Sequence, residues 1–199
     1  MDVAVIQTGV ANTASVLAGI AAVGGNPRLV DKADEIKSAG AVVLPGVGAF
    51  AAGMGSLAEL GLIDILRERI AANRSTLCVC LGMQLLADNS EESPGTKGLG
   101  VLGTNVVRFR GQVRIPQLGW NSVEPESGCE FLQKGCAYYA NSFHLEGQPN
   151  GWKAAWTEHG VRFVGAIERG AVLGCQFHPE LSGPWGRTLL KRWLERARG

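Results

Sequence analysis

Two short stretches of the chain carry the residue types of nucleophilic catalysis. In the first, Leu77-Cys78-Val79-Cys80-Leu81-Gly82, an apolar run predicts a strand that leads directly into a helix, with Cys80 at the corner. Such a corner lifts a side chain out of the sheet, and the backbone N–H groups at the helix start favour a thiolate and can receive an oxyanion. Taken alone, a cysteine at such a junction is weak evidence, because a free cysteine is more often one more buried small residue.

The second stretch, Gln176-Phe177-His178-Pro179-Glu180, places a histidine and a carboxylate at the end of another predicted strand. An imidazole can take the proton of a thiol and later protonate a leaving amine, and a carboxylate can fix the tautomer of the imidazole. Pro179 restricts His178 to extended geometry, which suits a rigid mount. The alternative is an ordinary strand-edge histidine followed by a solvated Glu180.

A glycine-containing loop, Pro45-Gly46-Val47-Gly48, follows the predicted strand at residues 41–44. Its two glycines let the backbone turn tightly and present N–H groups outward. A phosphate cradle is conceivable, but the lysine of a Walker motif is absent. A plain turn explains the loop as well as a functional role does.

Apolar strands that alternate with helices predict the scaffold for these residues. We expect strands at residues 3–6, 29–30, 41–44 and 76–79, and helices near residues 12–23 (capped by Asn12), 62–70 and 81–87. This alternation is typical of an α/β fold with an open, mostly parallel central sheet flanked by helices. Active sites of such sheets gather at the C-terminal ends of the strands, where Cys80 and His178 should meet.

The second half of the chain predicts an additional antiparallel strand region. Residues 104–109 and 112–115 flank a predicted hairpin turn at Arg110-Gly111. Further strands are expected near residues 137–141, 153–157, 162–168 and 172–176, before a final helix near residues 182–197. Because no repeat or linker interrupts the chain, residues 1–199 are predicted to form a single domain.

The composition narrows the function classes. The chain is 46% hydrophobic with a formal net charge of +1, which predicts neither nucleic-acid nor membrane binding. Five scattered cysteines and only three histidines argue against a disulfide scaffold and against zinc. No apolar run reaches a membrane-spanning length, and the start lacks a basic leader, so we expect a cytoplasmic protein without metal or cofactor.

Together, Cys80-Leu81-Gly82 and the late His178-Pro179-Glu180 resemble the signatures of the class I (triad-type) glutamine amidotransferases, which have a flavodoxin-like fold. Further motifs make the chain similar to the glutaminase subunits of imidazole glycerol phosphate synthase, in histidine biosynthesis. These motifs are Pro45-Gly46-Val47-Gly48, Cys80-Leu81-Gly82-Met83-Gln84-Leu85-Leu86, Ser90-Glu91-Glu92, Gly98-Leu99-Gly100, Gly119-Trp120-Asn121 and Gln176-Phe177-His178-Pro179-Glu180.

The resemblance implies the hydrolysis of glutamine to glutamate and ammonia. Cys80 would attack the side-chain amide to form a glutamyl thioester, His178 would shuttle protons, and Glu180 would orient His178. The implied oxyanion site is the backbone of a loop that needs a peptide flip, together with the start of the following helix, and the implied glutamine site lies beside it. Those further residues are Gly46, Val47, Gly48 and Leu81 for the oxyanion, and Gln84, Glu92, Ser142 and Phe143 for glutamine.

The implied partner is a (β/α)₈-barrel cyclase that forms a heterodimer with this chain. Ammonia would pass through the barrel to a ribulosyl-aminoimidazole nucleotide, giving imidazole glycerol phosphate and an aminoimidazole carboxamide ribotide. Trp120 and Asn121 would face that partner, although Trp120 could instead be a core aromatic. The other candidates are a glutaminase for pyridoxal phosphate, anthranilate or purine synthesis, a stand-alone cysteine hydrolase and a non-catalytic protein of this fold.

Three positions depart from the family pattern. Cys78 replaces a glycine two residues before Cys80, where strand alternation would put both cysteines on one face at the outer edge of disulfide reach. Gln117 stands where many relatives have histidine, and Asn141 occupies the first position of a related His-Ser-Tyr segment. Gln117 and Asn141 leave hydrolysis untouched in principle but put in doubt how the chain senses its partner's ligand.

Overall fold

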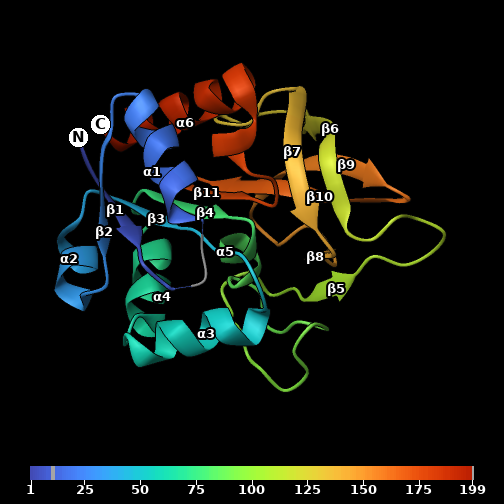
Figure 1. The fold of residues 1–199 in the computed structure, drawn as a ribbon, viewed down its shortest axis with the longest axis horizontal. Coiled ribbons are helices and arrows are strands. Elements are labelled where there is room, and N and C mark those ends of the chain that lie inside the picture. The colour runs from blue at the N-terminus through green and yellow to red at the C-terminus, as the bar shows by residue number, and fades with distance from the viewer. Residues whose placement is uncertain (10–11, 199) are drawn as a thin grey trace.

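The computed structural model describes residues 1–9 and 12–198, which are arranged around one mixed sheet (Figure 1). Parallel strands form one end of this sheet in the order β2-β1-β3-β4-β11. The residues of β3, β4 and β11 are all buried, because helices cover both faces. The bounds are Asp2–Ile6 (β1), Asn26–Val30 (β2), Ala41–Leu44 (β3), Thr76–Val79 (β4) and Val172–Cys175 (β11).

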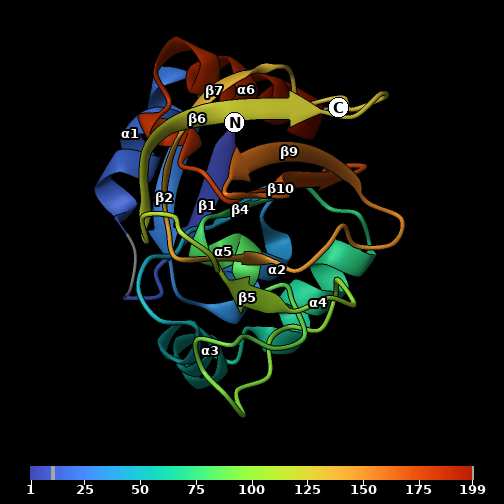
Figure 2. The same ribbon diagram turned by 90° about the vertical axis from the view of Figure 1, so that its right-hand side faces the viewer.

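Helices pack on both faces of the parallel strands (Figures 1 and 2). On one face, α1 (Thr13–Ala22) and α6 (Gly183–Ala197) bury side chains such as Ile20 and Trp193. On the other, α2 (Ala33–Ser38), α3 (Phe50–Glu59) and α4 (Ile63–Ala71) bury side chains such as Leu57 and Leu66. In the described part of the chain, no helix combines the length and the apolar character needed to cross a membrane. The predicted helix near residues 12–23 is present, but the Asn12 side chain forms no capping hydrogen bond.

The second half of the chain extends the sheet with antiparallel strands. After β11 the order continues β10-β9-β6-β7, while β8 pairs with both β5 and β10. A parallel sheet flanked by helices and extended by antiparallel strands confirms the predicted fold class. The bounds are Val106–Arg108 (β5), Gln117–Pro125 (β6), Gly135–Asn141 (β7), Phe143–Leu145 (β8), Lys153–His159 (β9) and Val161–Arg169 (β10).

The predicted hairpin at residues 104–115 is wrong. Strand β5 is short and pairs with β8, and residues 112–115 belong to no strand. Val113 and Ile115 alternate with polar residues because their side chains pack against the core, without pairing of their backbone. Side-chain burial therefore explains the alternation of apolar and polar residues at 112–115 without a strand.

Candidate active site

Cys80 occupies a strained corner between β4 and α5 (Leu81–Gln84), at the C-terminal edge of the parallel strands. Its φ of 54° and ψ of −111° are rare for a residue other than glycine. Its N–H donates to the Cys175 carbonyl of β11 at 2.7 Å, and its carbonyl accepts from the N–H of Met83 at 3.0 Å. These bonds hold a backbone conformation that an isolated turn would avoid. Helix α5 is shorter than the predicted helix at residues 81–87.

Close packing explains the glycine of Cys80-Leu81-Gly82. A Cβ atom built on Gly82 would lie 2.0 Å from the carbonyl oxygen of Leu44, at the end of β3. No real Cβ tolerates that distance from a backbone atom. Gly82 therefore lets the start of α5 approach β3, which fixes the position of Cys80.

The expectation that Cys78 and Cys80 share a face is wrong. Cys78 packs in the cluster beneath α3 and α4, whereas Cys80 belongs to the cluster beneath α1 and α6. The turn at Cys80 interrupts the strand alternation, and both thiols are free. Burial raises the pKa of Cys78 to about 12, so this thiol stays protonated at neutral pH.

His178 is held through its backbone by strand β7. Its N–H donates to the Tyr138 carbonyl at 2.9 Å, and its own carbonyl accepts from the Ser182 hydroxyl at 2.6 Å. The same Ser182 oxygen accepts from the N–H of Tyr138 at 3.0 Å. Strand β7 and Ser182 thus fix the backbone of His178 shortly after the end of β11.

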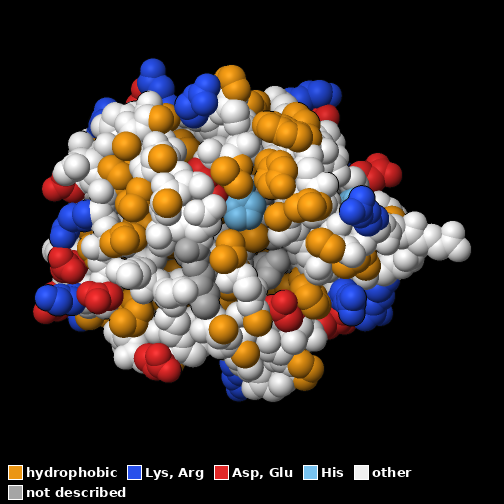
Figure 3. Space-filling view, in the orientation of Figure 1, with side chains coloured by type: hydrophobic (Ala, Val, Ile, Leu, Met, Phe, Trp, Pro, Cys, Tyr) orange, Lys and Arg blue, Asp and Glu red, His pale blue; other side chains and the backbone are white. Residues whose placement is uncertain are grey.

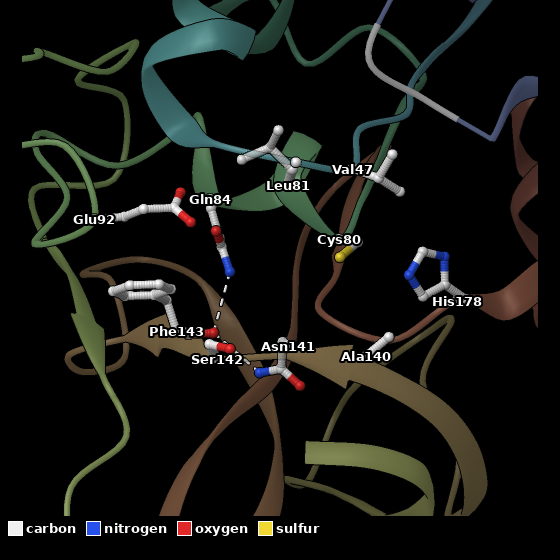
Figure 4. Close-up of a pocket in the computed structure, with 11 residues that line it drawn as sticks. Val47, Cys80, Leu81, Gln84, Glu92, Ala140, Asn141, Ser142, Phe143 and His178 are labelled. Atoms are coloured by element: carbon white, nitrogen blue, oxygen red, sulfur yellow. Dashed lines mark hydrogen bonds between the residues drawn. The ribbon is translucent and has the colours of Figure 1, made fainter. Parts of the chain in front are cut away.

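The His178 side chain lies between a sulfur and a carboxylate. Its Nδ1 is 2.8 Å from Oε1 of Glu180, and both side chains are more than nine-tenths buried. Figure 4 shows a ring nitrogen of His178 turned toward Cys80. Burial lowers the pKa of His178, but hydrogen bonds with Cys80 and Glu180 and their negative charges outweigh it and raise this pKa to about 10. The structure therefore brings Cys80, His178 and Glu180 together.

A pocket of about 280 Å³ opens beside Cys80 and His178 (Figure 4). All four predicted glutamine-binding residues lie in its wall, whereas Gly46 and Glu180 line a smaller hollow behind His178. The remaining lining residues of the pocket are Val47, Gly48, Leu81, Gln84, Glu92, Ala140, Asn141, Ser142 and Phe143.

The end of the pocket away from Cys80 offers hydrogen-bond acceptors. The Nε2 group of Gln84 donates to the Phe143 carbonyl at 3.1 Å and to Oε1 of Gln176 at 2.9 Å, which uses both of its hydrogens. Only the Gln84 oxygen remains for a ligand. Oε2 of Glu92 accepts from the N–H of Phe50, at the start of α3, at 2.7 Å. The other carboxylate oxygen, Oε1, remains for a ligand. This end suits a cationic, hydrogen-donating group.

In the predicted oxyanion loop, a backbone carbonyl already accepts the hydrogen bond that the implied donor would give to an oxyanion. The N–H of Leu81 donates to the carbonyl of Gly46 at 3.3 Å. A carbonyl oxygen therefore lies where an oxyanion would need the Leu81 N–H. Rotation of the Gly46–Val47 peptide would release the Leu81 N–H and would point the Val47 N–H to where the Gly46 carbonyl now lies. The φ of +91° at the following Gly48 favours glycine.

Sequence reasoning assigned no role to Gln176, although its side chain lies between Cys80 and Gln84. The available signal was a polar residue within the apolar run Val172–Phe177, because buried amides have hydrogen-bond partners.

The outer surface near the pocket is apolar. Figure 3 shows apolar side chains gathered around a histidine on this face. Trp120 is 58% exposed on β6, so the alternative of a core aromatic is wrong. Its ring packs edge-on against Tyr138, with centroids 6.3 Å apart, and Leu118 and Leu181 are also exposed. Asn121 lies on the same strand and donates to the Glu158 carbonyl at 2.7 Å.

Comparison with known proteins identifies the class. The profile of the family "Glutamine amidotransferase class-I" matches residues 4–197, and the chain belongs to this family. Crystal structures share the fold: one of a glutamine amidotransferase has a TM-score of 0.78 at 22% identity and covers 98% of this chain and 99% of its own. PurLQS from Thermotoga maritima has a TM-score of 0.72 at 15% identity, covering 98% and 97%.

Comparison with curated proteins points to one kind of subunit within this family. The chain is 37% identical over 195 residues to the imidazole glycerol phosphate synthase subunit HisH of Symbiobacterium thermophilum, covering 96% of this chain and 92% of that protein. It is 41% identical over 194 residues to the HisH subunit of Methanopyrus kandleri, covering 96% of each.

Proposed function

We propose that this chain is the glutaminase subunit of an imidazole glycerol phosphate synthase and supplies ammonia for histidine biosynthesis. The names of its curated relatives support the pathway. The observation that carries the chemistry is a buried Cys80–His178–Glu180 arrangement at the base of a pocket whose far end offers acceptors. The arrangement fits an amino-acid substrate whose side chain reaches the sulfur.

Glutamine binds with its ends sorted by charge. The α-ammonium group donates to Glu92 and to the free oxygen of Gln84, because neither offers a donor to the pocket. The α-carboxylate accepts from the Ser142 hydroxyl and from the backbone next to Phe143. The side-chain amide then extends toward Cys80, at the other end of the pocket.

The reaction starts from a thiolate–imidazolium pair, which the raised pKa of His178 favours. The sulfur of Cys80 attacks the amide carbon, and His178 protonates the departing nitrogen, so ammonia leaves and a thioester remains. Neutral His178 then takes a proton from water, and the resulting hydroxide attacks the thioester. The C–S bond then breaks, which restores the thiolate–imidazolium pair and releases glutamate, whose carboxyl proton passes to water. Glu180 holds the imidazole throughout.

The partner is a (β/α)₈-barrel cyclase, bound as a heterodimer over the apolar surface that carries Trp120 and Asn121. Because the Leu81 N–H donates to the Gly46 carbonyl, this donor is not available to an oxyanion in the conformation of the chain alone. Contact with the partner shifts the loop toward the rotated peptide. This coupling withholds ammonia until an acceptor enzyme is present.

Glutaminase assays of the chain alone, with the cyclase, and with the cyclase and its nucleotide ligand test this function. We expect stimulation of about 100-fold or more, since one oxyanion donor contributes about 10²–10³ to kcat. Strong activity of the chain alone that the cyclase leaves unchanged would instead indicate a stand-alone hydrolase. Co-purification with a different synthase would reassign the pathway.

Labelling with the glutamine analogue 6-diazo-5-oxonorleucine tests the nucleophile independently. We expect a covalent adduct on Cys80, located by peptide mass spectrometry and suppressed by glutamine. The Cys80→Ser variant is the control for background reaction. A protein that keeps the fold without catalysis would give no adduct.

A further inference from the structure

Gln176 is a fully buried amide that touches the candidate nucleophile. It directly follows β11, is 0% exposed, and its backbone N–H donates to the Gly165 carbonyl at 2.9 Å. Its side-chain Nε2 lies 3.8 Å from Sγ of Cys80, within hydrogen-bond reach of sulfur. Its Oε1 accepts from Gln84 Nε2 at 2.9 Å. Both ends of the amide are therefore engaged at the site.

A backbone carbonyl fixes the orientation of both amides. The Phe143 oxygen can only accept a hydrogen bond, so the Gln84 group that faces it is Nε2. The same Nε2 lies against Gln176, which must therefore present its oxygen to Gln84. The N–H group of Gln176 is left for Cys80. If the Gln176 amide were flipped, its NH₂ group would face the NH₂ group of Gln84, and its oxygen would face the sulfur of Cys80.

We propose that Gln176 is a positioning residue that stabilises the thiolate of Cys80 and ties it to the substrate-binding amide of Gln84. This inference deepens the proposed function and rests on it. An N–H donor favours the charged form of sulfur, most strongly where water is excluded. His178 gives up its proton when ammonia leaves, whereas the amide of Gln176 keeps its hydrogens at every stage. The sulfur thus retains one donor throughout the reaction.

The pH dependence of Cys80 alkylation by iodoacetamide tests this role in the chain alone. Only the thiolate reacts, and peptide mass spectrometry separates Cys80 from the other cysteines. We expect Gln176→Met, which keeps length and removes the donor, to move the midpoint upward by about one pH unit. Alkylation below the midpoint would then be about tenfold slower, as one pKa unit corresponds to a factor of ten.

Gln117→Met is the matched control. Gln117 is also buried, lies on β6, and its amide atoms have no partner among residues 1–9 and 12–198. The same substitution there should leave the midpoint unchanged. An equal shift in both variants would overturn the proposal, because it would reflect the replacement of any buried amide by methionine and not the loss of the contact with Cys80. An unchanged midpoint in Gln176→Met would overturn it as well.

Two further measurements complete the design. If Gln176→Met does not fold, Gln176→Asn carries the same prediction, because its shorter amide cannot span Cys80 and Gln84. In the complex with the cyclase, loss of the Gln84 contact should raise KM for glutamine as well as lower kcat. Alkylation requires no glutamine turnover, so the proposed function can fail in assays while the thiolate role is still decided.

Discussion

The parallel and antiparallel parts of the sheet contribute to the candidate site in different ways. The parallel strands end at the residues proposed to react: Cys80 after β4 and His178 after β11. The antiparallel strands supply the pocket wall at residues 140–143 and clamp the His178 backbone through Tyr138. Their outer surface also carries Trp120. The residues proposed to react and the surface proposed to bind the partner thus lie in different parts of the sheet.

Burial explains this division. Strands β3, β4 and β11 are buried along their whole length, so a change there disturbs packing on both faces. Strand β6 alternates between buried and exposed residues, and its outward side chains can change without altering the core. Substitutions of the residues proposed to react at the ends of the parallel strands should therefore remove catalysis, and those of the outward side chains of β6 should alter association.

The largest expected effect separates the two cysteines near the corner. Cys80→Ser should lower glutaminase activity of the complex by about 10⁴-fold or more, because the nucleophile is lost. Cys78→Gly should retain activity, since Cys78 faces the other core cluster and its pKa is raised to about 12 by burial. Steady-state assays check both variants. If Cys78→Gly abolishes activity and Cys80→Ser retains it, Cys80 is not the nucleophile.

Glu180→Gln should lower kcat by about 10²–10⁴-fold while leaving partner affinity unchanged. The amide can no longer stabilise the imidazolium, whose Nδ1 is 2.8 Å from the carboxylate. Activity that persists in Glu180→Gln would remove the carboxylate from the proposed mechanism. Glu158→Gln makes the same change at an exposed position on β9 and should leave kcat unchanged.

The same pair predicts a pH dependence of stability. The pKa of His178 is raised from 6.5 to about 10, so this side chain binds more protons in the folded protein than in the unfolded chain between these values. The stabilising contribution is complete below pH 6.5 and is lost as pH rises toward 10. Urea unfolding across this window should show the decline, and Glu180→Gln should flatten it. Equal slopes would contradict a charged His178.

A smaller effect is expected on the outer surface. Trp120→Ala should weaken cyclase binding by about 30-fold, or roughly 2 kcal/mol, as for an aromatic interface anchor. Titration calorimetry measures the affinity. Leu29→Ala on β2, at the opposite edge of the sheet, removes another exposed apolar side chain and should have no effect. Unchanged affinity in Trp120→Ala would exclude this surface from the interface.

The parallel strands could be predicted because burial on both faces gives continuous apolar runs, as in Ala41–Leu44 and Thr76–Val79. The faces of Cys78 and Cys80 could not, since they depend on one rare backbone conformation. The state of the oxyanion loop was also hidden, because glycine allows either orientation of the Gly46–Val47 peptide. Strand β6 was missed, since Gly119 and several polar residues weaken its pattern.

The smallest expected effect contrasts one buried glutamine from each part of the sheet, Gln117 and Gln176. The amide of Gln117 on β6 has no hydrogen-bond partner among the described residues, so Gln117→Met should raise the free energy of unfolding by about 1–2 kcal/mol. Gln176→Met removes satisfied bonds to Cys80 and Gln84 and should lower it by a similar amount. Urea denaturation measures both. If Gln117→Met is destabilising instead, its amide is satisfied by ordered water, and the antiparallel part tolerates buried polar groups as the parallel part does.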